Sequence, residues 1–152
     1  MVTLPIHLVT ALAAMFIYGV YLLYFDYDIE ETIVSFFLLI FNVLSYFLYS
    51  FYFLRKFKWT TVFASTFLFV VIGLALWIIS DAIYAPDFIE MAFWYYHVAG
   101  HTSYLWYENM YIDPDIYAAH GYGYLYSTVP AFIILFGYGC GRLLLKMNAN
   151  RV

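Results

Sequence analysis

The residue types most able to do chemistry are three histidines and two aspartates in the second half of the chain. His97 and His101 stand four residues apart, so on a helix their imidazoles would lie one turn apart on the same face. That separation lets two side chains bind one metal ion, and His120, Asp113 and Asp115 are the nearest residues that could complete the site. Nitrogen ligands with an open position suit copper or zinc, so the pattern indicates a Cu or Zn site.

The spacing also limits this hypothesis. The motif lacks the glutamate that follows the first histidine in zinc-protease helices. Glu90 and Glu108 would share the helical face, but each is seven residues from the nearer histidine, about 10 Å along the axis, and cannot join the same site. Asp26 or Asp28 from another loop is a further candidate ligand. Histidines at a wet interface more often hydrogen-bond tyrosines and acidic neighbours, so metal binding is the alternative interpretation.

The stretch that holds these residues, 81–128, is too polar to sit in lipid and unusually rich in aromatic side chains. It carries six of the ten acidic residues and no Lys or Arg, which separates it from the rest of the chain. We expect 88–109 to form a helix lying in the outer membrane interface, where Trp and Tyr are favoured. The uncharged run 91–107 has 17 residues, the bottom of the usable range for a transmembrane helix, so a fifth span is the alternative.

Composition places the whole chain in a membrane. The 152 residues are 66% hydrophobic and only 11% charged, whereas soluble domains have about a quarter of their residues charged. A soluble domain of this size could not bury so much apolar surface. The single cysteine, Cys140, excludes an internal disulfide, and the net charge of −4 offers no basic surface for nucleic acid.

Four apolar runs are long enough to cross a bilayer, because roughly 20 residues at 1.5 Å per residue span a hydrocarbon core of about 30 Å. The runs are about 4–25, 33–54, 59–80 and 129–146. We therefore predict an all-α membrane protein, a single domain over 1–152 with four transmembrane helices. An aromatic, histidine-containing extracytoplasmic interfacial segment would lie between the third and fourth helices.

Charge segregation predicts the orientation. All six basic residues lie at 55–58 or 142–151, and all ten acidic residues lie within 26–32 or 81–128. The positive-inside rule then puts the basic turn and both termini in the cytoplasm and the two acidic segments outside. Five spans would place the two basic clusters on opposite sides of the membrane, so the charge pattern favours four.

Polar and small residues within the spans predict helix–helix contacts. Asn42, near the middle of the second span, must find a partner in lipid, typically on another helix. Gly137 and Gly141 form a G-x-x-x-G spacing, which favours close helix association. A second copy of the chain is one candidate partner for that face.

Three local features complete the prediction. His7 and Thr10, in the first turns of the first span, are expected to hydrogen-bond at the interface. Thr32 can cap the second span, because its hydroxyl can accept an unpaired amide proton. Pro130 fits the first turn of the last span, where its missing N–H costs nothing.

The pattern as a whole favours a structural role. No charged residue lies in the middle of a span, and no nucleophile–base pair or nucleotide loop is apparent. A large aromatic outer stretch is typical of an interface. We therefore expect a small multi-pass subunit of a larger integral-membrane complex, in contact with other membrane subunits and lipid and not catalytic on its own. The alternative is an extracytoplasmic metal-binding protein or metalloenzyme, while transporter, immunity and viral envelope roles are not distinguished.

Overall fold

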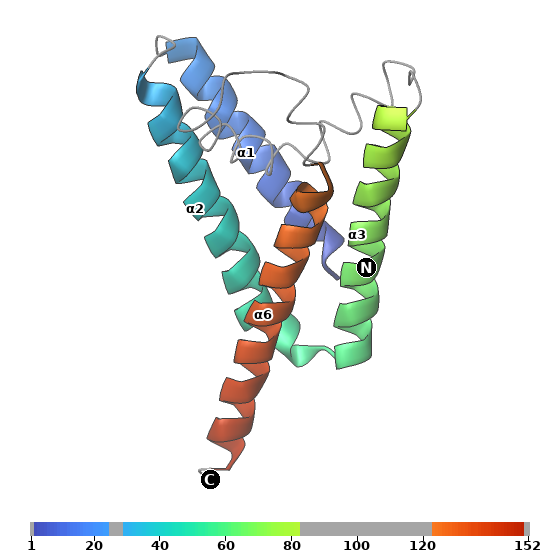
Figure 1. Cartoon of the computed structure of the whole chain (residues 1–152). Coiled ribbons are helices and arrows are strands. Elements are labelled where there is room, and N and C mark those ends of the chain that lie inside the picture. The colour runs from blue at the N-terminus through green and yellow to red at the C-terminus, as the bar shows by residue number, and fades with distance from the viewer. Residues whose placement is uncertain (1, 25–28, 83–122, 151–152) are drawn as a thin grey trace.

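The computed structural model describes residues 2–24, 29–82 and 123–150, and this part of the chain is helical throughout apart from its connections. Four long α-helices and one short 3₁₀ helix make up the described residues (Figure 1). Their bounds are α1 Leu4–Tyr24, α2 Ile29–Tyr52, η1 Leu54–Lys56, α3 Trp59–Ala82 and α6 Gly123–Ala149. The all-α prediction is confirmed for these residues, whereas the expected interfacial helix over 88–109 lies outside them.

Three of the described helices contain stretches long and apolar enough to cross a membrane: Phe36–Lys56, Trp59–Ile79 and Thr128–Ala149. Helix α1 has 21 residues, but the apolar part with described side chains, Leu4–Ile17, is shorter than a full span. Backbone groups in lipid must be satisfied internally, and a helix does this within one segment. An integral membrane protein follows from these stretches, while the orientation stays a prediction.

Two predicted helix starts are wrong. Helix α2 begins at Ile29, so Thr32 lies inside it and is not its N-cap. Acidic residue types in a first turn suit the positive end of the helix dipole, which allows the helix to begin before Glu30 and Glu31. Helix α6 begins at Gly123, so Pro130 lies inside the helix and is buried. Membrane helices tolerate such a proline where neighbouring helices pack around the interruption.

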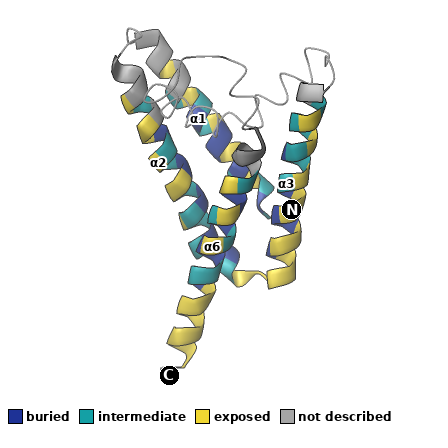
Figure 2. Cartoon of the chain, viewed as in Figure 1, coloured by how far each residue is buried: buried dark blue, intermediate teal, exposed yellow. Residues whose placement is uncertain are grey.

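Helix α6 occupies the centre of the arrangement (Figure 1). It packs mainly against α2 and also against α3, whereas α1 packs against α2. The turn containing η1 joins α2 to α3 at one end, and α6 continues past this turn to the C-terminus. Residues 142–150, which form that extension, are all exposed (Figure 2).

The main core lies where α2, α3, α6 and the turn meet. It consists of five buried residues: Tyr46, Leu54, Val62, Ile134 and Tyr138. Leu54 of η1 is fully buried, and the Phe57 N–H donates to its carbonyl at 2.9 Å, which closes the turn. A second small cluster joins α1 to α2 through Ala14 and Leu38.

Candidate functional site

The predicted metal ligands are not among the residues that the structure describes. His97, His101, His120, Asp113 and Asp115 all lie between residues 83 and 122. Within the described ranges, no group of three or more His, Cys, Asp or Glu side chains could hold a metal ion. The Cu or Zn hypothesis therefore stays a prediction from sequence, and the described sites are of a different kind.

Gly137 and Gly141 lie against α2 of the same chain. A Cβ at Gly137 would stand 2.7 Å from the Phe47 carbonyl oxygen and 3.1 Å from Ser50 Cβ. A Cβ at Gly141 would collide with the Phe51 carbonyl oxygen. The two glycines thus let the α6 and α2 backbones meet, and the G-x-x-x-G face that could have met a second copy is covered by α2.

The expected hydrogen bond of Thr10 is not found, because its buried Oγ1 has no hydrogen-bond partner among the described residues. A buried polar seam, whose partner helices the sequence did not indicate, joins α1 to its neighbours. It consists of Thr3, His7 and Thr10, which are spaced i, i+4 and i+7 and are all essentially inaccessible. His7 Nδ1 lies 2.8 Å from the Tyr46 hydroxyl of α2. Thr3 Oγ1 lies 2.7 Å from Ser65 Oγ of α3, which also accepts the Thr3 N–H at 3.0 Å. The helical spacing of three polar residues in an apolar run is the signal that could have revealed this seam.

His7 lies inside the bundle rather than at a wet interface. Its ring contacts Phe69 of α3 edge-on, with centroids 4.6 Å apart, while its Nδ1 faces Tyr46 of α2. An ionisable side chain within a membrane protein marks a candidate functional site, and its polar partner helps to define that site. Here the partners come from two different helices, so the arrangement clamps the start of α1 between α2 and α3. Asn42, also buried, lies one turn from Tyr46 on α2, and its predicted role in helix contact stays a prediction.

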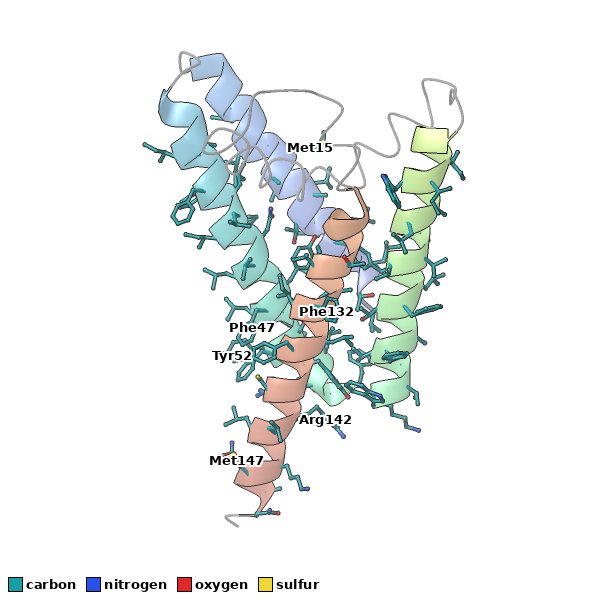
Figure 3. All side chains as sticks on the ribbon, viewed as in Figure 1. Met15, Phe47, Tyr52, Phe132, Arg142 and Met147 are labelled. Carbon is teal, nitrogen blue, oxygen red and sulfur yellow. The ribbon has the colours of Figure 1, made fainter. Side chains whose placement is uncertain are left out.

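A surface groove, here called the α3–α6 groove, runs between two stripes of side chains. Each stripe follows the spacing i, i+3, i+4, i+7, so each is one face of its helix. The floor is made by the buried Thr66 and Ala131, and exposed phenylalanines form the walls, including Phe132 at 73% exposure (Figure 3). Its volume is about 200 Å³, and the lining is Phe63, Thr66, Phe67, Val70, Thr128, Ala131, Phe132 and Leu135.

A second groove, here called the basal groove, lies where the start of α3 meets the lower part of α6. It has a volume of about 530 Å³ and is lined by Trp59, Tyr138, Gly139, Arg142, Leu143, Leu145 and Lys146. Tyr138 is buried, donates a hydrogen bond to the Phe57 carbonyl at 3.0 Å and packs on the Trp59 ring at 5.5 Å. Tyr138 therefore ties one wall to Trp59 and the turn, while Arg142 and Lys146 bring two exposed cations to the other.

Arg55 is another cation near the basal groove, but its side chain contacts aromatic rings outside the groove. The Arg55 guanidinium carbon lies 6.0 Å and 5.6 Å from the ring centroids of Phe51 and Tyr52, within the range of cation–π attraction. Tyr52 and Phe47 lie on the side of α6 away from α3 (Figure 3). Arg55 is thus not a wall of the basal groove.

Comparison with known proteins adds no relative to this description: no family model, curated protein or solved structure matches the chain.

Proposed function

We propose that this chain is a small membrane subunit of a larger integral-membrane complex and that a transmembrane helix of its partner lies in the α3–α6 groove. The observation that carries the proposal is the pair of facing helical stripes with a small-residue floor and exposed phenylalanine walls. Helices in lipid gain little from the hydrophobic effect, because lipid tails are as apolar as leucine. Their association depends on packing, which a preformed groove provides.

The dimensions of the groove fit a helix better than a small molecule. Each stripe spans eight residues, a rise of about 10 Å from the first to the last, which is two turns of a helix. A partner ridge with the same i, i+3, i+4, i+7 spacing would match this length, as in helix-in-groove recognition. The volume of about 200 Å³ is below the range of about 300–1,000 Å³ that holds small ligands.

The burial of the spans supports the same proposal. Only 28% of each of the three candidate spans is buried within the chain. The remainder includes large aromatic side chains on both sides of the groove, such as Phe63 and Phe67 at 49% and 63% exposure. These rings are exposed enough to contact another protein, and aromatic residues are enriched at protein interfaces.

Co-purification with two matched variants tests the proposal. Phe132 and Phe16 are both 73% exposed on long helices, but only Phe132 lines the groove. We expect Phe132→Ala to reduce recovery of a membrane partner from native membranes about fivefold or more, since a contact residue that matters contributes over about 1 kcal/mol. Phe16→Ala should leave recovery unchanged. Equal recovery with both variants, or a folded chain that purifies alone, would contradict the proposal.

The metal-binding alternative rests on the sequence pattern His97-x-x-x-His101 with His120. It has its own test, which does not depend on the groove. Metal analysis of natively folded, detergent-purified protein should find stoichiometric Cu or Zn that is lost in His97→Ala/His101→Ala. Absence of stoichiometric Cu or Zn from the unchanged chain would rule the alternative out.

A further inference from the structure

We propose that the basal groove binds the headgroup of an anionic phospholipid. The groove combines two cations with an interfacial aromatic wall at the end of the bundle that holds every basic residue of the described chain. Basic pockets between helix ends are typical sites for anionic headgroups. This inference is independent of the α3–α6 groove and of the partner that would occupy it.

The cations have the geometry that a phosphate requires. Arg142 and Lys146 are four residues apart on α6, so their side chains lie on one face, one turn apart. Arginine can bind a phosphate with two parallel N–H donors, and lysine adds a point charge. Figure 3 shows Arg142 on the side of α6 that faces the foot of α3, beside the groove.

No acidic residue of the chain competes for these cations from nearby sequence. None of the ten acidic residues lies within 32–80 or 116–152, the parts of the sequence that form α3 up to Ser80, α6 and the turn. Among the described contacts, Arg142 has one long hydrogen bond, from Nη1 to the Arg55 carbonyl at 3.5 Å. The charge of the groove therefore complements an anion and is not neutralised by the described residues.

The opposite wall suits the interfacial part of a lipid. Trp59 is 53% exposed, and an indole at a membrane surface keeps its ring in the apolar layer and its N–H near polar groups. Gly139 leaves the groove open, because a Cβ at this position would meet no atom within 4 Å. The apolar stem of a lipid can thus lie along Trp59 and Gly139, with its phosphate at the two cations.

The test measures lipid preference of the full chain in bilayer vesicles. Spin-labelled phosphatidylglycerol and phosphatidylcholine are compared by the fraction of label immobilised at the protein. We expect the unchanged chain to prefer phosphatidylglycerol, and Arg142→Gln/Lys146→Gln to lose about fivefold in that preference for each cation removed. Inorganic phosphate at millimolar concentration should not displace the lipid; displacement would assign the groove to a soluble anion and overturn the proposal.

Two further variants distinguish lipid binding in the groove from general attraction of anionic lipid to the basic end of the bundle. Lys56→Gln/Lys58→Gln removes the same charge at the same end from residues that do not line the groove. Gly139→Leu keeps every charge but fills the groove where there is free space. We expect the first to retain most of the preference and the second to lose it, with thermal unfolding in detergent confirming that each is folded. Equal losses in both double variants, or full preference in Gly139→Leu, would overturn the proposal.

Discussion

Gly137 and Gly139 are two residues apart on α6, yet their surroundings differ completely. A Cβ at Gly137 meets the α2 backbone, whereas one at Gly139 meets nothing within 4 Å. Backbone atoms of a packed helix cannot move aside as the end of a flexible side chain can. The spacing of glycines in the sequence therefore says that a helix approaches closely, but only the structure says which glycine it approaches.

These surroundings predict opposite effects of the same substitution. Gly137→Ala should lower the free energy of unfolding by about 1–3 kcal/mol, because the added methyl overpacks the contact with Phe47 and Ser50. Gly139→Ala should be neutral or stabilising by up to about 1 kcal/mol, since alanine is the better helix former. Thermal unfolding in a mild detergent compares the two. Equal effects would contradict the α2–α6 contact.

The His7–Tyr46 pair is the polar contact with the clearest energetic consequence. Tyr46→Phe removes a buried hydroxyl 2.8 Å from His7 Nδ1, and losing a buried hydrogen bond costs about 1–3 kcal/mol of stability. The matched control is Tyr49→Phe. The Tyr49 hydroxyl donates to the Val2 carbonyl from a partly buried position, so its removal should cost less stability. A double-mutant cycle with His7→Leu should show coupling between residues 7 and 46. Additive effects would mean that the pair does not interact.

The positions of the helices in the chain were largely predictable, whereas the way in which the helices pack against one another was not. A run of about 20 apolar residues must be helical in lipid, and the runs 4–25 and 59–80 match the bounds of helices α1 and α3 within two residues. Of these two helices, α3 contains a stretch long enough to cross a membrane, whereas the described apolar part of α1 is shorter. Helices α2 and α6 start earlier than predicted, because acidic residues and proline favour a helix boundary in sequence but lie inside these two helices. The spacing of Thr3, His7 and Thr10 indicates one polar face on α1. Which helices supply the partners of that face depends on tilt and packing, which no local pattern encodes.

The turn between α2 and α3 should be a stable element because of one leucine. Leu54 is fully buried in the main core, whereas its neighbour Phe53 is 63% exposed. We expect Leu54→Ala to lower stability by about 2 kcal/mol, at the low end for core leucines because the surrounding lipid is itself apolar. Phe53→Ala removes only a ring stacked on Tyr49 at 5.4 Å and should cost about 1 kcal/mol or less. Unfolding curves in detergent measure both, and a larger loss from Phe53→Ala would contradict the described packing of the turn.

At the scale of the whole molecule, the basic turn and the C-terminus lie at the same end of the bundle (Figure 1). The positive-inside rule then predicts that both face the cytoplasm. In a Cys140→Ser background, cysteines placed at Lys56 and at Asn150 should react with an impermeant reagent only after the membrane is opened. Labelling of either position from outside intact cells would contradict the predicted orientation.

Helix α6 has one contact face that α2 covers and a second that lines a groove left open by the described residues. The G-x-x-x-G face of α6 is covered by α2. The stripes of α3 and α6 that face each other form the α3–α6 groove. A sequence motif for helix association was therefore visible, but it belongs to the fold of the monomer. The groove could not be predicted, because its two walls come from helices more than 50 residues apart in the chain.

Site-specific photo-crosslinking in native membranes tests the proposed role most directly. A photoreactive phenylalanine analogue is placed at Phe132 in the α3–α6 groove or at the equally exposed Phe16 of α1. We predict that position 132 joins the 17.9 kDa chain to one membrane protein in a discrete heavier product, and that position 16 does not. Lipid adducts alone at position 132, or the same protein products from both positions, would contradict it.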